Sequence, residues 1–341
     1  MAYVTGTLTN FDDFLTRFKT FVTTNSQLVG DGQQWTVLKD SDVDSDFADD
    51  ALCTGANATS ATSGPFIRRI YFSSPGLGGT DTIYHCLTSL KTAGGAYNIE
   101  IRNMQAFSSA SLLTEQVGVS PAHYLLLNNA ASVNPYWFFV NGRRAIMVVR
   151  VSGSIYESGY MGWGNPHGAP AEVPLPYMTG GSCSTYSLTP SDVSAVHRAF
   201  FAPYAAATAL GSASTLSVNI PNTANWLPIG NYSAASSAQN LNTNCVTPLV
   251  SLAGRGASGS SSLLRPQGYC YGNTDRKIRP IGIVSGLTGS AGSYGDLDGV
   301  YYVSGEGLAS EDILDDGPND YLVFQSAFYT DRESYCAIKR A

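Results

Sequence analysis

The sequence predicts a mainly β fold with an N-terminal amphipathic helix, an α+β chain of antiparallel sheets, hairpins and long ordered loops. Three observations favour this class. Charged residues make up only 13% of the 341 residues, about half the usual share of roughly 25%. The chain contains 35 glycines and 20 tyrosines, with frequent Ser, Thr and Asn. Short apolar runs bounded by turn-forming residues follow one another along most of the chain, as strands do.

The first expected element is a helix that docks on a sheet. Its apolar face consists of residues at helical spacing: Phe11, Phe14, Leu15, Phe18, Phe21 and Val22. We expect Thr9 to cap this helix, with Asp12 three residues further on. Asp12 and Asp13 would then lie at the positive end of the helix dipole.

Short strands are expected next. Residues 33–39 predict a strand that carries Trp35, and the acidic run 40–46 is expected to be a solvated loop. A helix-loop-helix calcium site counted from Asp42 would need Gly at position 47 and Glu at position 53, where Phe47 and Cys53 stand. Further candidate strands are 66–73, 82–87 and 97–102, and a Gly-rich turn at 74–79 joins the first two.

The clearest local signal is a hairpin over residues 136–151, followed by a strand at 154–162. Asn141 and Gly142 stand between its two apolar arms, and both tolerate positive φ, so a two-residue primed turn is expected there. The second arm is apolar almost without alternation. We therefore predict a central strand that is covered on both faces.

Residues 162–182 contain four prolines, at 166, 170, 174 and 176, which argue against a helix and against an inner strand. We predict an extended arm that packs on a neighbouring domain or subunit. Its contact residues would be Trp163, Pro174, Leu175, Pro176, Tyr177 and Met178. The chain is accordingly divided into an N-terminal α+β domain, 1–182, which ends in this proline-rich arm, and a Gly/Ser-rich second β region, 183–341.

The second region is expected to contain one short helix within 189–206, starting near Pro190, and a long surface loop at 251–262. Strands are predicted at 277–284 and 299–303. The chain would close with a hairpin made by residues 321–328 and 334–339.

The residues that carry chemistry are dispersed, and we predict no catalytic residue, no cofactor and no metal. No nucleophile elbow is present. The four histidines, His85, His123, His167 and His197, stand alone and are expected to be structural. His85 and Cys86 are neighbours on a strand and would point to opposite faces. Five carboxylates are candidates that nothing in the sequence pairs: Glu157, Glu172, Glu306, Glu311 and Asp312.

Charge and hydropathy also bear on partners. The net charge is −7 and the 19 basic residues do not cluster, so direct nucleic-acid binding is not expected. Apolar runs are far shorter than the roughly 20 residues that span a bilayer, so no membrane contact is expected. The N-terminus lacks a signal-peptide pattern, which predicts a protein that stays in the cytoplasm or leaves it by lysis.

Six cysteines are widely scattered without metal-ligand spacing: Cys53, Cys86, Cys183, Cys245, Cys270 and Cys336. Two interpretations stay open. The cysteines are buried, reduced apolar side chains, or some of them form disulfides, within or between chains, once the protein leaves the cell.

Several segments together resemble one protein family. They are TGTLT (5–9) with the helix after it, SPGLGGTDTIY (74–84), YWFFVNGRR (136–144), IYESGYMG (155–162), PLPYMTGGS (174–182), LDGVYYVSG (297–305) and the stretch from Tyr321. In that order they resemble virion structural proteins of tailed bacteriophages. The resemblance covers most of the chain and is loosest over 183–290. The cysteines are not part of it.

The resemblance implies a structural subunit of a phage particle. It suggests a contractile-tailed phage, in which the subunit sheathes the neck or collar, or sits in the tail or baseplate. The implied partners are further copies of the chain, in a trimer- or hexamer-type assembly, and other neck or tail proteins of the virion. The family pattern marks no catalytic residue.

Two alternatives remain. The first is a receptor- or glycan-binding tail appendage, because 20 tyrosines and four tryptophans could line sugar sites. The second is a cell-wall or polysaccharide hydrolase, in which carboxylates such as Glu157 or Glu311 would act.

The cysteines generate a prediction for the mature particle. If they cross-link subunits, non-reducing gels of purified particles will show this chain as a larger species that reductant converts to a monomer band. A single monomer band without reductant would contradict cross-linking between chains.

Overall fold

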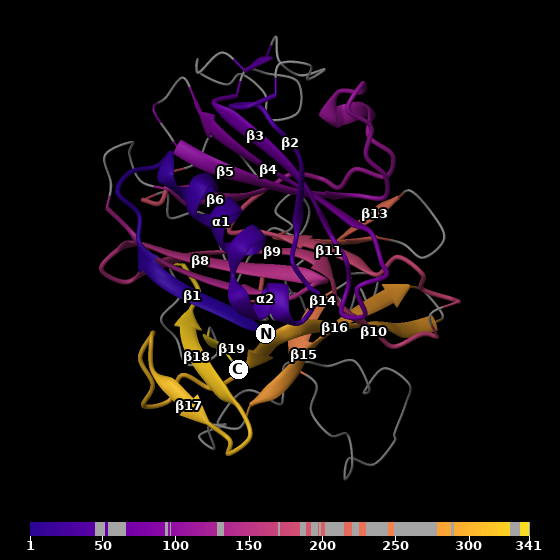
Figure 1. Ribbon diagram of the computed structural model, residues 1–341. Helices are drawn as coiled ribbons and strands as arrows, with labels where there is room; N and C mark the ends of the chain where they lie inside the picture. Colours follow the sequence, from indigo (N-terminus) through magenta and orange to yellow (C-terminus); the bar gives the residue numbers. More distant parts are fainter. Residues whose placement is uncertain are drawn as a thin grey trace.

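The computed structural model describes most of the chain and is mainly β, with helices near the N-terminus, as predicted (Figure 1). The described residues are 1–44, 52–53, 66–92, 95, 97–127, 133–169, 171–184, 189–191, 197, 199–201, 215–219, 225–229, 245–248, 278–287, 290–327 and 335–340. Every pair of strands within them is antiparallel.

Three open sheets stack as layers, which we call upper, middle and lower after their places in Figure 1. The upper sheet has the order β2 (Thr36–Asp40), β3 (Arg68–Ser74), β4 (Ile83–Lys91), β5 (Tyr97–Met104), β6 (His123–Leu127). The middle sheet has the order β1 (Ala2–Thr7), β7 (Pro135–Val140), β8 (Arg144–Ser152), β9 (Ile155–Trp163), β11 (Tyr177–Gly180), β12 (Leu216–Asn219), β13 (Trp226–Ile229).

The lower sheet has the order β14 (Cys245–Pro248), β15 (Arg279–Leu287), β16 (Ser290–Tyr302), β19 (Tyr335–Lys339), β18 (Asp320–Gln325), β17 (Ile313–Asp315), and β10 (Asn165–Pro166) also pairs with β16. The helices are α1 (Asp13–Thr24) and α2 (Ser26–Gly30), and a 3-10 turn covers Leu113–Glu115. The predicted closing hairpin is confirmed by the pairing of β18 with β19.

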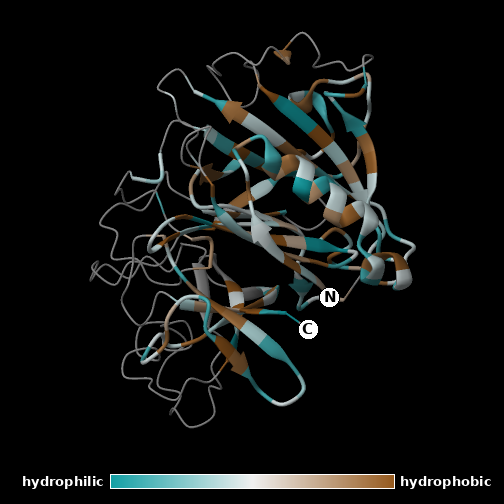
Figure 2. Cartoon of the chain, turned by 60° about the vertical axis from the view of Figure 1, so that its left-hand side comes forward, coloured by the Kyte–Doolittle hydropathy of each residue, from teal (hydrophilic) through white to brown (hydrophobic). Residues whose placement is uncertain are grey.

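The middle sheet is covered on both faces, which confirms the prediction for the second arm of the hairpin. Along β8, Met147 and Val149 belong to the core shared with α1 and the upper sheet. Ile146 and Val148 between them belong to the core shared with the lower sheet. Because side chains alternate across a strand, one continuous apolar run serves two cores. Figure 2 shows the hydropathy of the residues along these strands.

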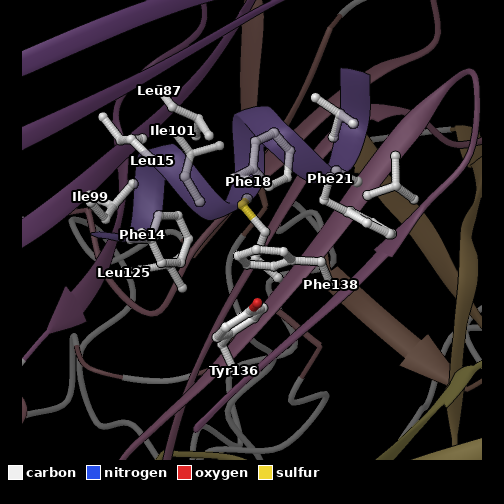
Figure 3. Close-up of a cluster of buried hydrophobic side chains, with 14 of the residues drawn as sticks. Phe14, Leu15, Phe18, Phe21, Leu87, Ile99, Ile101, Leu125, Tyr136 and Phe138 are labelled. Atoms are coloured by element: carbon white, nitrogen blue, oxygen red, sulfur yellow. The ribbon is translucent and has the colours of Figure 1, made fainter. Parts of the chain in front are cut away.

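Helix α1 fills the space between the upper and middle sheets with the face that the sequence predicts (Figure 3). The ring centroid of Phe18 lies 5.3 Å from that of Phe138 on β7 and 5.7 Å from that of Phe72 on β3, in edge-to-face geometry. Phe14 meets Phe138 at 5.4 Å. Such pairs add about 0.5–1.5 kcal/mol each to the burial of apolar area, so the helix joins two sheets through Phe18.

The predicted cap of this helix is wrong. The N-cap residue is Asp12, and its side chain makes no capping hydrogen bond. The backbone N and the Oγ1 of Thr9 donate instead to Oδ2 of Asp13, and Oδ1 of Asn10 accepts from the backbone N of Asp13. The helix begins at residue 13 because residues 9–12 form a turn in which these side chains already satisfy the first amides.

The acidic run also differs from the expectation of a solvated loop. Asp40 ends β2 and is 1% exposed. Its Oδ2 lies 2.7 Å from both Lys19 Nζ and Arg68 Nη2. Burial alone would raise the pKa of Asp40, but these two cations lower it overall. The ion pair with Lys19 thereby holds the edge strand β2 against α1. Residues 45–46 lie outside the described part.

The exclusion of an inner strand from the proline segment is wrong. Residues 177–180 form β11, an inner strand between β9 and β12. The four residues after Pro176 all have backbone N–H groups, so they can form the hydrogen bonds of an inner strand, which the preceding prolines cannot donate. Pro166 stands in the two-residue strand β10, which among the described strands pairs with β16 alone. Pro170 lies outside the described residues.

The predicted contact residues of this segment are divided between the interior and the surface. Tyr177 and Met178 are 1% and 2% exposed and Pro176 is buried, all within the chain itself. Trp163 and Leu175 are half-buried, and Pro174 is exposed. The stretch is therefore largely a part of the chain's own middle sheet, and its use as an arm on a neighbour stays a prediction only for the accessible residues.

The second region supplies strands to two sheets. After residue 182, the proposed domain boundary, β12 and β13 continue the middle sheet. The strands expected at 277–284 and 299–303 correspond to β15 and β16, and β16 starts earlier than expected. Of the stretch 189–206, the described residues 189–191, 197 and 199–201 are not helical. The loop predicted at 251–262 lies outside the described residues.

The predicted hairpin of β7 and β8 is confirmed, but its turn is of a different kind. Val140 pairs with Ala145, and Asn141 N donates to Arg144 O at 3.1 Å. Neither Asn141 nor Gly142 has positive φ. Glycine is required at 142 for another reason: Gly76 N donates to Gly142 O at 2.7 Å, and a Cβ on Gly142 would lie 1.9 Å from Gly76 O.

Gly142→Ala should therefore destabilise the fold by about 1–3 kcal/mol, because the backbone of the 74–79 link must move away. Urea denaturation measures this change. Gly153→Ala, in the turn between β8 and β9, is the matched control, since a Cβ there meets nothing within 4 Å. Equal stability of the two variants would contradict the role given to Gly142.

Candidate functional site

The 141–144 turn meets the lower sheet through one half-buried carboxylate. Asp298 on β16 accepts hydrogen bonds at Oδ2 from Arg144 Nε at 2.9 Å and from Arg143 Nε at 3.1 Å. Asn141 Nδ2 donates to the same oxygen at 3.3 Å. Arg144 is 2% exposed, so water does not stabilise its positive charge and the carboxylate of Asp298 must do so.

The electrostatics of this contact favour the ionised carboxylate. Burial alone would raise the pKa of Asp298, but the charges of Arg144 and Arg143 and their hydrogen bonds lower it far below its ordinary value. The following residue, Gly299, has φ of 75°, and a Cβ there would lie 1.9 Å from Arg144 Nη2. Glycine at 299 therefore makes room for the guanidinium.

The same turn contacts the upper side of the molecule. Trp35 Nε1 donates to Asn141 O at 2.9 Å, and Gln33 Oε1 accepts from Gly142 N at 3.0 Å. Asn141 Oδ1 accepts from the backbone N of Arg143 and of Arg144. One turn of the middle sheet is thus bonded to the segment before β2, to the 74–79 link and to the lower sheet. We call this set of contacts the turn node.

A second buried polar cluster joins the upper and middle sheets. Ser74 Oγ lies 2.8 Å from His85 Nε2, and His85 Nδ1 lies 2.8 Å from Asn103 Oδ1. Asn103 Nδ2 donates to Met178 O and to Thr179 Oγ1 on β11, each at 2.7 Å. The Asn103 oxygen therefore faces the imidazole and accepts from Nδ1–H, so Nε2 accepts from the Ser74 hydroxyl.

This order of hydroxyl, imidazole and amide is the arrangement of a nucleophilic triad, but its surroundings favour a structural use. Ser74 is 2% exposed, and His85 and Asn103 are fully buried. The ring of His85 stacks on Trp35 with centroids 4.3 Å apart. Burial lowers the pKa of His85 to about 4, with the Asn103 hydrogen bond opposing it. The imidazole is neutral and a weak base, and it ties two sheets together.

Sequence reasoning took His85 to be structural and did not find its partners. His85 and Asn103 are opposite each other in the β4–β5 register, and Ser74 lies on the next strand. Only the strand register brings residues 74, 85 and 103 together, and no spacing in the sequence signals it.

Two further histidines are bound inside the fold. His123 Nε2 lies 2.9 Å from Ser217 Oγ on β12, and burial, followed by the charge of Arg102, lowers the pKa of His123 to about 3. His197 Nε2 lies 2.6 Å from Oε1 of Glu157, and both side chains are fully buried. The sequence paired no carboxylate with any other group, whereas the fold pairs Glu157 with His197.

One polar cluster lies nearer the surface, where the middle and lower sheets meet. Glu311 Oε1 accepts from Tyr156 Oη at 2.7 Å and from Arg150 Nη1 at 2.5 Å. Glu311 has φ of 75°, which a non-glycine residue seldom adopts. Burial, followed by the bond to Glu311, raises the pKa of Tyr156 to about 12, so the phenol stays protonated and donates.

The other candidate carboxylates serve loop amides or solvent. Glu172 is exposed and its Oε2 accepts from Ala169 N, and Asp312 Oδ2 accepts from Ala309 N. Glu306 is exposed. Glu311 is the candidate that combines partial exposure with backbone strain, which is a feature of functional positions.

Four of the six cysteines can be placed. Cys53, Cys86, Cys183 and Cys336 are thiols, so no disulfide joins them to one another. The last three are buried, and burial raises the pKa of Cys336. Cys53 is half-buried and its Sγ lies 3.2 Å from Ile67 O. The side chain of Cys245 and the whole of Cys270 lie outside the described part, and cross-linking between chains stays a prediction.

No family model and no curated protein matches the chain. Within the described ranges, no three His, Cys, Asp or Glu side chains gather closely enough to hold a metal ion. Neither helix in those ranges is long and apolar enough to cross a membrane.

Asp298→Asn should cost about 3–5 kcal/mol at neutral pH, because it leaves the buried guanidinium of Arg144 without its counter-charge. The native pKa of Asp298 lies below the unfolded value of about 3.9. Its contribution is therefore complete above about pH 4 and is lost as the pH falls further. Urea denaturation should show the two proteins converging in acid.

The matched control for this change is Asp320→Asn. Asp320 pairs with Arg340 on the surface, where both side chains are about one third exposed. A surface pair contributes roughly 0–1 kcal/mol. A loss for Asp298→Asn no greater than that of the control would contradict the role of the turn node.

The His85 cluster predicts a stability loss at mildly acidic pH. The unfolded chain binds a proton near pH 6.5, whereas folded His85 resists protonation until about pH 4. Stability should therefore fall as the pH drops from about 6.5 to 4. His85→Gln should remove roughly 1–3 kcal/mol of that fall in urea titrations. His167→Gln, at an exposed position, is the control, and an identical pH profile for both variants would contradict the assignment.

Proposed function

We propose that this chain is a structural subunit of a tailed-phage particle, which assembles with itself and with neighbouring proteins around the neck, collar or tail. The observation that carries the proposal is the use of buried polar groups as ties between three stacked sheets. The turn node bonds the middle sheet to both of its neighbours, and the His85 cluster bonds the upper sheet to β11. A block held in this way resists shear between its layers.

The composition supports assembly. Only 13% of residues are charged, and charge is what normally keeps soluble proteins apart. Tyrosine, which suits packed interfaces, occurs 20 times. The segments that resemble virion proteins also coincide with structural junctions: YWFFVNGRR contains the turn node and LDGVYYVSG contains Asp298.

In this proposal the subunit acts mechanically, in the virion, and catalyses no reaction. Its partners are other copies, in a trimer- or hexamer-type assembly, and other neck or tail proteins. It takes no cofactor or metal and makes no direct contact with nucleic acid or membrane. Repetition of each contact in a closed symmetric assembly makes the association effectively permanent.

The proposal is tested on purified, washed particles. We expect mass spectrometry to find the chain at a copy number that is a multiple of three or six. Antibody-labelled electron microscopy should place it at the neck, collar or tail. Deletion of its gene should give particles that lack this part, and the intact gene supplied in trans should restore them. Absence of the chain from washed infectious particles would contradict the proposal.

A second candidate function, binding of a receptor or glycan by a tail appendage, is favoured by the strained Glu311 beside Arg150 and Tyr156. A carboxylate and a guanidinium at the surface offer an acceptor and donors to sugar hydroxyls. A glycan array would detect this activity, and Glu311→Gln should abolish it while Glu306→Gln, at an exposed position, should not. An array without hits would count against this candidate.

A further inference from the structure

Among the strands that the structure describes, β1 forms one outer edge of the middle sheet and pairs with β7 alone (Figure 1). Thr5 and Thr7 on this strand are exposed. An edge strand presents unpaired N–H and C=O groups that accept a further strand. The direction of the backbone groups of β1 therefore decides how a further strand can pair with it.

The hydrogen-bond ladder between β1 and β7 shows which backbone groups of β1 point outward. Leu8 N donates to Asn134 O at 2.9 Å, so these two residues form a hydrogen-bonded pair just beyond the strand. Such pairs alternate in an antiparallel ladder. Gly6, Val4 and Ala2 therefore bond to β7, and Tyr3, Thr5 and Thr7 direct their backbone groups outward. Thr7 stands opposite Pro135, which lacks an N–H, in agreement with this phase.

The other described edge strands have features that hinder the pairing of a further strand. β2 has a bulge between Val37 and Lys39 and ends in Asp40. β17 has only three residues and includes Asp315. β13 and β14 have four residues each, including a proline in each strand. β6 is buried, and Tyr124 in it forms a bridge with Cys183. Bulges, charges, prolines and shortness are the usual protections of an edge.

None of these protections is present in β1. It has six residues without a charge, a proline or a register shift. The side chains of the residues on either side of it, Met1, Leu8 and Thr9, are uncharged as well. A strand without charge cannot repel an identical strand laid against it, whereas like charges placed opposite each other destabilise a pair.

We propose that β1 pairs with β1 of a second copy of this chain, antiparallel and across a two-fold axis, so that the two middle sheets become one continuous sheet. The inference rests on the proposed function, because it names one contact through which such a subunit meets its own copies. The outward residues set the register: Thr5 faces Thr5 of the other copy, and Tyr3 faces Thr7. Three such pairs supply about six hydrogen bonds.

Two-fold pairing agrees with an assembly built on threes or sixes. Dihedral symmetry contains two-fold axes together with a higher axis, so pairs of β1 strands can join two rings or neighbouring subunits. The contact is small, and a stable interface needs roughly 1,000 Å² or more of buried surface. The isolated chain is therefore expected to pair reversibly, and repeated contacts in a particle strengthen the association.

The first experiment measures the oligomeric state of the purified full-length chain by sedimentation over a range of concentrations. The wild type should show a dimer whose fraction rises with concentration. Thr5→Lys places two lysines opposite each other and should weaken dimerisation at least about tenfold. Thr36→Lys is the matched control, since Thr36 is an exposed threonine on the already protected edge strand β2 and should leave dimerisation unchanged.

A second experiment tests the register by cross-linking. In a hydrogen-bonded pair the two Cα atoms lie about 5.5 Å apart, which a disulfide spans. Thr5→Cys should therefore give a reducible dimer under mild oxidation. Thr36→Cys and the wild type give the background from the natural cysteines, and the dimer of Thr5→Cys should exceed it. Cross-linking of Thr5→Cys to a different protein in particles, instead of to itself, would overturn the proposal.

Different results overturn the pairing through β1 and the proposed function. A wild type that is monomeric at all concentrations, or a Thr5→Lys variant that dimerises as the wild type does, overturns pairing through β1. Neither result removes the chain from the particle, which mass spectrometry of washed virions decides. Absence from virions together with dimerisation sensitive to Thr5→Lys would overturn the function and leave the contact in place.

Discussion

The stacking of the three sheets depends on the turn between β7 and β8. Its backbone approaches Gly76 so closely that no side chain fits at Gly142. Its arginines share the carboxylate of Asp298. Taking Arg144 out of water costs several kcal/mol unless a counter-charge is held beside it, so the lower sheet must present Asp298 at this place. The positions of three layers are thereby coupled at one turn.

Apolar packing and buried polar contacts stabilise the fold in different ways. The two cores on either face of the middle sheet supply the driving force, since burial of apolar area dominates folding. Apolar contacts are not directional and would allow layers to slide. The His85 cluster and the turn node are directional and leave buried groups unsatisfied if the layers shift. A rigid block of this kind agrees with the proposed structural role, and the uncharged edge at β1 is the contact proposed to join it to a second copy.

Some elements could be predicted because their signal is local. The face of α1 follows from apolar spacing, and the covered strand β8 follows from an unbroken apolar run. Other elements could not be predicted. The prolines before Tyr177 concealed an inner strand, and the Asn-Gly pair suggested positive φ where the true requirement was space. In both cases a neighbouring strand or loop, which the local sequence does not report, decided the outcome.

By itself, the sequence determined the class of this protein: its hydrophobic periodicity specifies which segments are strands or helix and which faces are buried, because that pattern depends only on nearby residues. Tertiary structure alone decided the polar ties. Arg144 and Asp298 are 154 residues apart, and Ser74, His85 and Asn103 meet only through strand register. Register is set by packing across the whole sheet, so pairings of this kind arise only when the layers have come together.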